Sequence, residues 1–268
     1  MSEAAVCRLG IVGLRGTEGE YETGKKLAEL CLREFQSLND KGGEASALHF
    51  LAELNSDLNH YDLAVRAARD MQAAGRAIGD DGVQIRALRA LSKIHLRFES
   101  HKDAKRAAES ALKYAERLMD GVYIVEFLLI IAQACTQIAQ QDRHPTQARG
   151  MLSKALTQAY SALNVARRMR AWQSKVDEGR ALVMVARVIM ARGHMEDGGT
   201  KRCSLEEAMR FAKEAIDVFR KGNDVVHEAE ATTVVALIHF YGGEQGRAED
   251  MAEQAVHLAN RSGEAECG

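Results

Sequence analysis

The pattern GxxxxGK, formed by Gly19, Gly24 and Lys25, follows the apolar run LGIVGL near the start of the chain. Between a strand and a helix, such a loop cradles the phosphates of a nucleotide with backbone N–H groups, and its lysine reaches the terminal phosphates. Two observations oppose that chemistry here. Lys26 stands where a Ser or Thr would hold magnesium, and two glutamates inside the loop would repel phosphates. Nucleotide binding at this degenerate loop is therefore a remote alternative.

Histidines and cysteines are the other residues that could bind metals or act as nucleophiles. The nine histidines are scattered, and the sequence contains neither HExxH nor GxSxG. The five cysteines are widely spaced and form no CxxC pair, so neither a zinc site nor a disulfide framework is indicated: Cys7, Cys31, Cys135, Cys203 and Cys267. We therefore expect no enzyme activity, no cofactor and no metal. Free thiols favour a reducing, cytoplasmic location.

Composition favours helix and argues against nucleic-acid and membrane partners. Lys plus Arg number 36 and Asp plus Glu 38, which leaves a net charge of -2 over 268 residues. General nucleic-acid binders are far more basic than this. The single proline favours helix, because proline is the strongest helix breaker. The strongest apolar stretch, residues 127–132, is too short to cross a bilayer.

A repeat of about 40 residues supplies the elements that must position any functional residue. The first helix of each copy carries a large residue, then a large and a small one three and four positions later: Leu48, Leu51, Ala52; Leu88, Leu91, Ser92; Leu128, Ile131, Ala132; Leu182, Val185, Ala186; Thr232, Val235, Ala236. The second helix carries small residues at steps of four and three: Ala104, Ala108, Ala111; Ala155, Ala159, Ala162; Ala208, Ala212, Ala215; Ala248, Ala252, Ala255. A helical hairpin repeated without any strand pattern predicts an all-α stack.

Six units are expected, at about residues 4–40, 41–80, 81–120, 121–174, 175–224 and 225–263. The first unit is degenerate, and Gly24, Ala28 and Cys31 fill the small positions of its second helix. Its first helix would turn one face inward through Cys7, Ile11 and Leu14. Because no hairpin can bury its own apolar stripe, we expect residues 1–268 to form one superhelical domain.

These features resemble tetratricopeptide repeats (TPRs). The resemblance rests on the leading large residue, the large and small pair that follows it and the small residues of the second helix, over about residues 17–262. The period is similar to that of kinesin light chain repeats, although the proline that ends the 34-residue form is missing. The resemblance implies a right-handed α-solenoid of about six helix–turn–helix repeats. It also implies a scaffold or adaptor role in protein binding, without naming the partner.

Two insertions interrupt the repeat on the same edge of the stack. The first large and first small positions of a hairpin are normally 16 residues apart, but 27 apart in the fourth unit and 26 in the fifth. The insertion at about residues 140–151 is expected to begin a long helix from Pro145 to about Trp172. That at about residues 194–203 is expected to form a loop, with Ser204 and Glu207 as a capping box. Tolerated length variation and a second contact edge both stay open.

The resemblance further implies where a partner would bind, because first helices line the concave groove of TPR stacks. The groove residues it implies are Arg86, Arg89, Lys93 and Arg97 on the third unit, Leu129, Ile130 and Gln133 on the fourth, Arg180, Val183, Met184 and Arg187 on the fifth, and Val234, Leu237 and Phe240 on the sixth. A basic stripe beside an apolar floor suits a protein or peptide segment that carries acidic residues and hydrophobic anchors.

Two other interpretations are kept beside the groove. The basic residues could form a solvated face, paired with Glu53, Glu126 or Glu230, above apolar residues that are simply buried. Alternatively, the chain could be a structural subunit of a larger assembly, held through the long helix of the fourth unit and through the terminal helix. That helix would expose Met251, Val256 and Leu258. An uncapped terminal helix would also allow self-association.

Overall fold

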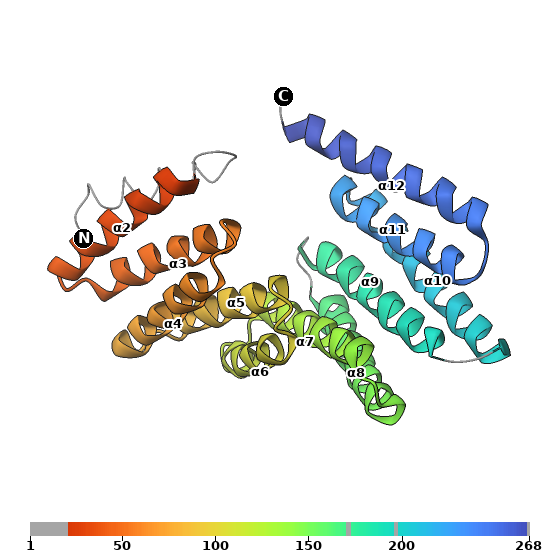
Figure 1. The fold of residues 1–268 in the computed structure, drawn as a ribbon, viewed down its shortest axis with the longest axis horizontal. Helices are drawn as coiled ribbons and strands as arrows, with labels where there is room; N and C mark the ends of the chain where they lie inside the picture. Colours follow the sequence, from red (N-terminus) through yellow and green to blue (C-terminus); the bar gives the residue numbers. More distant parts are fainter. Residues whose placement is uncertain (1–20, 170–172, 196–197, 267–268) are drawn as a thin grey trace. The chain divides into compact units, whose positions relative to one another are not determined.

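The computed structural model describes residues 21–169, 173–195 and 198–266, and all secondary structure in this part is helical. The chain divides into two compact units, Met1–Leu118 and Met119–Gly268. The first contains α2 (Tyr21–Ser37), α3 (Lys41–Asp57), α4 (Tyr61–Ile78), α5 (Asp81–Arg97) and α6 (His101–Arg117). The second contains α7 (Gly121–Gln141), α8 (Pro145–Arg168), α9 (Gln173–His194), α10 (Gly198–Lys221), α11 (Val225–Tyr241) and α12 (Gln245–Glu266) (Figure 1).

The helices pair as the repeat predicts. Within each unit a helix packs against its neighbours in the chain. First helices also contact each other: α3 contacts α5, α7 contacts α9, and α9 contacts α11. Along the described part of the chain the hairpins are α3–α4, α5–α6, α7–α8, α9–α10 and α11–α12. The expected first helix of the chain, with Cys7, Ile11 and Leu14, lies outside the described residues. The all-α prediction is confirmed for the part of the chain that the structure describes.

A left-handed residue at regular intervals of 20 ends one helix and starts the next. Positive φ angles occur at Asn39 (52°), Asn59 (60°), Gly79 (68°), Glu99 (58°) and Met119 (52°), and again at Asn223 and Gly243. At the first of these turns, the N–H of Asp40 donates to the carbonyl of Phe35 at 2.9 Å, and that of Asn39 to Gln36 at 3.1 Å. This pair of bonds is the Schellman arrangement, which satisfies the last carbonyls of a helix.

An aspartate directly after several of these turns caps the following first helix. The Oδ1 atoms of Asp40, Asp80 and Asp224 accept from backbone N–H groups three residues on, at 3.0, 3.0 and 3.1 Å. Asp120 accepts from Tyr123 at 3.2 Å in the same way. Each cap satisfies one of the orphan donors at a helix N-terminus. The reversal of the chain is therefore encoded locally, by a left-handed residue followed by an aspartate.

The small residues of the second helices are the closest points of the packing. Each of the alanines at these positions in α4, α6, α8 and α10 has no exposed surface: Ala64, Ala68, Ala104, Ala108, Ala111, Ala155, Ala159, Ala162, Ala208, Ala212 and Ala215. Ala252 on α12 is exposed. The predicted close-contact role is confirmed for α4, α6, α8 and α10.

Two glycines make room for phenylalanine rings at the same kind of contact. A Cβ atom on Gly43 of α3 would lie 2.2 Å from the Phe35 ring of α2, and one on Gly179 of α9 would lie 2.4 Å from the Phe219 ring of α10. Both rings are almost fully buried. At these two positions a missing Cβ is required by the close approach of a neighbouring helix.

Both insertions lengthen helices rather than forming loops. The helices α7 to α10 have 21 to 24 residues, whereas α3, α5, α6 and α11 have 17. Pro145 opens α8 as predicted, but α8 ends at Arg168, before Trp172, which lies outside the described residues. The predicted capping box is wrong, because α10 begins at Gly198 and Ser204 lies inside it. Ser204 is buried there, 2.8 Å from where a Cβ on Gly193 would lie, so it serves as a small packing residue.

One helix, α7, is long and apolar enough to cross a membrane by length and composition, and 67% of its most apolar window is buried inside the protein. A core helix of a folded domain has the same character, because its apolar residues face neighbouring helices on several sides. No membrane span is implied. This helix also holds the buried Cys135.

The glycine contacts can be tested by adding a single methyl group. We expect Gly43→Ala to lower the free energy of unfolding by about 1–3 kcal/mol, because the new Cβ would overlap the Phe35 ring. The neighbouring Gly42→Ala is the matched control, since its nearest atom would be 3.5 Å away. It should be neutral or stabilising by up to about 1 kcal/mol. Denaturant unfolding measures both, and equal stability of the two variants would contradict the packing.

Candidate functional site

Helix α5 carries the basic residues that the resemblance assigns to the groove. Arg86, Lys93 and Arg97 are exposed, and Arg89 is half-buried. Steps of three and four residues bring them to one face of the helix. The Nη1 of Arg97 lies 2.6 Å from the Oδ1 of Asp57 on α3. Helix α5 therefore presents a row of cationic side chains to solvent.

The apolar floor implied by the resemblance is buried inside the second unit. Its members expose less than a tenth of their surface: Leu129, Ile130, Val183, Met184 and Val234. Helix α9 contacts both α7 and α11, so the flanks of these first helices are covered by one another. Only Gln133, Leu237 (39% exposed) and Phe240 (61%) are open to solvent. The assignment of these residues to a partner site stays a prediction, and most of its apolar part is core in this structure.

The two arginines predicted on α9 are both paired. Arg187 lies 2.8 Å from Glu230 on α11, and Arg180 lies 3.4 Å from Asp177 on its own helix. Each is about one-third exposed. On α9, the structure therefore agrees with the solvated, charge-paired face that was kept as the alternative.

Carboxylates buried near the start of first helices bind arginines from the preceding second helix, and the sequence analysis missed them. Glu178 of α9 accepts from Arg167 of α8 at 3.0 Å and from Lys175 at 2.9 Å. Glu228 of α11 accepts from Arg220 of α10 at 2.9 Å. Burial alone would raise the pKa of Glu178, but the hydrogen bonds from Lys175 and Arg167 hold it below its ordinary value. Both arginines lie 12 residues after the first small position, which is the signal that could have revealed these clamps.

Asp177 is the most deeply buried carboxylate of the second unit, with 1% of its surface exposed. Desolvation raises its pKa; Arg180 opposes the shift, while the charge of Glu126 on α7 adds to it and His227 on α11 opposes it. Its Oδ2 atom has no hydrogen-bond partner within the described residues. Burial therefore disfavours the charged form of Asp177, where α9 packs against α7 and α11.

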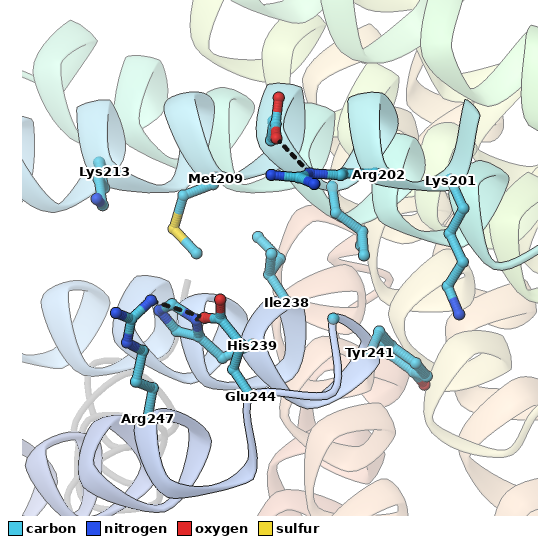
Figure 2. A pocket seen from close by; sticks show the side chains of 12 residues that line it. Lys201, Arg202, Met209, Lys213, Ile238, His239, Tyr241, Glu244 and Arg247 are labelled. Carbon is cyan, nitrogen blue, oxygen red and sulfur yellow. Dashed lines mark hydrogen bonds and ion pairs between the residues drawn. The ribbon is translucent and has the colours of Figure 1, made fainter. Parts of the chain in front are cut away.

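A cleft of about 710 Å³ lies along α10, where the lengthened helix meets the end of α11 and the start of α12 (Figure 2). Its lining residues are Lys201, Arg202, Leu205, Glu206, Met209, Lys213, Ile238, His239, Tyr241, Gly242, Glu244 and Arg247. Lys201 and Arg202 come from the second insertion. Glu244 binds His239 at 2.6 Å and Arg247 at 3.1 Å, and these hydrogen bonds lower the pKa of Glu244. A contact edge was one of the two interpretations of this insertion, and the sequence pattern did not single out these residues.

A second cavity, of about 440 Å³, opens at the same edge. It is lined by Ala139, Gln140, Asp142, Leu152, Met190, Ala191, His194, Met195 and Tyr241. Tyr241 lines both cavities and packs its ring 5.0 Å from that of His194. In the first unit, a shallower cleft of about 860 Å³ lies between α4 and α6. The described residues hold no cluster of three metal-binding side chains.

Four of the residues singled out in the sequence take packing roles: His95, Cys31, Cys135 and Gly24. His95 is buried and bonded to the hydroxyl of Tyr61 at 3.0 Å, and burial lowers its pKa. Cys31 and Cys135 are buried, whereas Cys203 is exposed. Gly24 is buried inside α2, where a Cβ would lie 3.6 Å from Leu54. It thus fills the small packing position, while Gly19 of the GxxxxGK pattern lies outside the described residues.

Comparisons with known proteins show the fold. No protein-family model and no curated protein matches the chain. The crystal structure of BtubC (BKLC) from P. vanneervenii is 15% identical, with a TM-score of 0.58 over 92% of this chain and 93% of that one. The apo form of RapI is 8% identical, with a TM-score of 0.62 over 97% of this chain and 99% of that one. Both are TPR-type proteins, the first of the kinesin light chain kind, and the chain has a TPR-like fold.

The buried carboxylates Asp177 and Glu178 should respond to pH with opposite signs. The pKa of Asp177 is raised, so its charged form costs stability once pH exceeds the ordinary carboxyl pKa, and Asp177→Asn should raise the melting temperature at pH 7. The pKa of Glu178 is lowered, so Glu178→Gln should reduce it there. Both differences should shrink in acid, as the wild-type carboxyls become protonated. Melting curves across pH measure this, and equal signs at pH 7 would contradict the assignment.

Proposed function

We propose that this protein is a scaffold that binds a segment of a partner protein through the first-helix face of its repeats. The observation that carries the proposal is the row of exposed cations on α5, with Arg86, Lys93 and Arg97 on one face. Packing between neighbouring helices runs through the buried alanines, and these three cations lie on the exposed face of α5. A cationic row on a rigid helix favours a segment that carries several acidic side chains.

The second unit offers a partner fewer exposed apolar residues than the sequence suggested. Leu237 and Phe240 on α11 are the apolar residues of the predicted set that remain exposed. The ring of Phe240 lies 5.7 Å from that of Tyr241 in an edge-on arrangement. Exposed aromatic and aliphatic side chains on a helix face are favourable contacts for a partner. The proposal therefore places charge recognition on α5 of the first unit, and the exposed apolar pair on α11 is a separate contact surface of the second unit.

The charge proposal is tested by reversing two residues on α5. A displayed peptide library selected on the wild-type chain should yield acidic sequences, and Arg86→Glu with Lys93→Glu should weaken their binding by about tenfold or more. Binding should also weaken as salt rises, because exposed charges are screened. The matched control is Arg33→Glu with Lys102→Glu, an exposed pair on second helices of the same unit. Equal binding by both double variants would contradict the proposal.

A structural role in a larger assembly is the second candidate, and the terminal helix favours it. Val256 on α12 is 60% exposed, and Met251 is half-buried. Leu258, which was expected to be exposed as well, is buried against the rest of the second unit. A Val256→Asp variant should disrupt assembly or self-association through α12 and leave segment binding to α5 unchanged. Sedimentation of the purified chain at increasing concentration reports self-association.

A further inference from the structure

We propose that the cleft along α10 is a second binding site, which takes an acidic segment of a partner protein with an apolar residue near its middle. This site is distinct from the cationic row on α5, because it is lined by the second helices α10 and α12, by the end of α11 and by the edge that the second insertion builds. The inference does not depend on the α5 site. It follows from the charge, the floor and the length of the cleft.

The charge of the cleft is opposite to that of the chain. Its lining contains four Lys or Arg side chains and two carboxylates, whereas the whole chain carries a net charge of -2. Each carboxylate is already bound within its own wall: Glu206 lies 3.1 Å from Arg202, and Glu244 lies 3.1 Å from Arg247. Lys201 and Lys213 make no ion pair to any residue in the described part. The cleft therefore has positive charge left for an outside partner.

The floor between these lysines is apolar. Figure 2 shows Lys213 and Lys201 toward opposite ends of the α10 wall, with Met209 and Ile238 between them. Leu205 and Tyr241 complete the apolar part. Among the described residues α10 and α12 make no mutual contact, so α11 forms the base of the cleft between them. Methionine adapts its shape to different ligands, which suits a floor that receives one apolar side chain.

The length of the cleft sets the length of its occupant. Lys201 and Lys213 are 12 residues apart on one helix, which corresponds to about 18 Å along the axis. An extended chain covers about 3.3 Å per residue, so about six residues span that distance. The expected segment thus has an acidic residue at each end, one apolar residue between them, and a length of about six residues. A repeat without the insertion would lack the Lys201 end of this site.

The test uses a phage-displayed library of random octapeptides, selected on the immobilised full chain. The selected peptides should carry acidic residues flanking an apolar one. By fluorescence anisotropy they should lose about tenfold or more in affinity with Lys201→Glu and Lys213→Glu. Met209→Gln, which keeps every charge, should weaken them several-fold through the lost apolar contact. Lys154→Glu with Lys221→Glu changes two exposed lysines of the same unit outside the cleft, and should bind as the wild type does.

The outcomes separate this inference from the proposed function. Peptides that lose affinity with the α10 variants but not with Arg86→Glu and Lys93→Glu support the cleft alone. The reverse pattern overturns the cleft and leaves the α5 site standing. Selection without acidic enrichment, or equal binding to the α10 and control variants, also overturns it. So does tight binding of a labelled single-stranded RNA that is lost with the same two lysines while no acidic peptide binds.

Discussion

The close approach of neighbouring helices at alanine and glycine is the constraint on which the rest of this structure depends. Ala108 on α6 and Ala159 on α8 have no exposed surface at all, so any larger side chain there would push neighbouring helices apart. This spacing lets the large residues one turn away fill the seams. A second helix such as α6 packs through a single stripe of small residues, and its other faces are left to charged residues.

Function in such an array depends on what the packing leaves exposed and on how long the helices are. The first helices of the second unit lie side by side, which buries the apolar residues between them and pairs Arg187 with Glu230. The insertions change the edge instead, because they lengthen α7 to α10 by about a turn or more. Helix α10 is longer than the neighbouring α11, and the cleft along α10 lies where the two helices differ in length. A packing framework and a binding edge are thus encoded by different parts of the sequence.

The order and pairing of the helices could be predicted well from the sequence because the same pattern recurs along the chain. Small residues, leading large residues and unit boundaries all recur, and the helices follow them closely. Features that occur through contacts between repeats were harder to predict. The clamp between Arg167 and Glu178 joins residues whose pairing depends on how two hairpins stack. Ser204 has the spacing of a helix cap, but the contact with Gly193 continues the helix through it. The burial of Leu129 and Val183 likewise depends on neighbouring first helices rather than on their own helix.

The seam of small residues is tested most directly by enlarging one alanine inside it and one outside it on the same helix. Ala68 and Ala73 both lie on α4; the first has no exposed surface and the second is exposed. The measurement is the free energy of unfolding of Ala68→Leu and Ala73→Leu from denaturant titration. If close contact at alanine stabilises the array, Ala68→Leu should lower the free energy of unfolding by about 1–3 kcal/mol or more. Ala73→Leu should change it by no more than about 0.5 kcal/mol. Equal stability of the two variants would contradict the claim that close contact at alanine holds the array together.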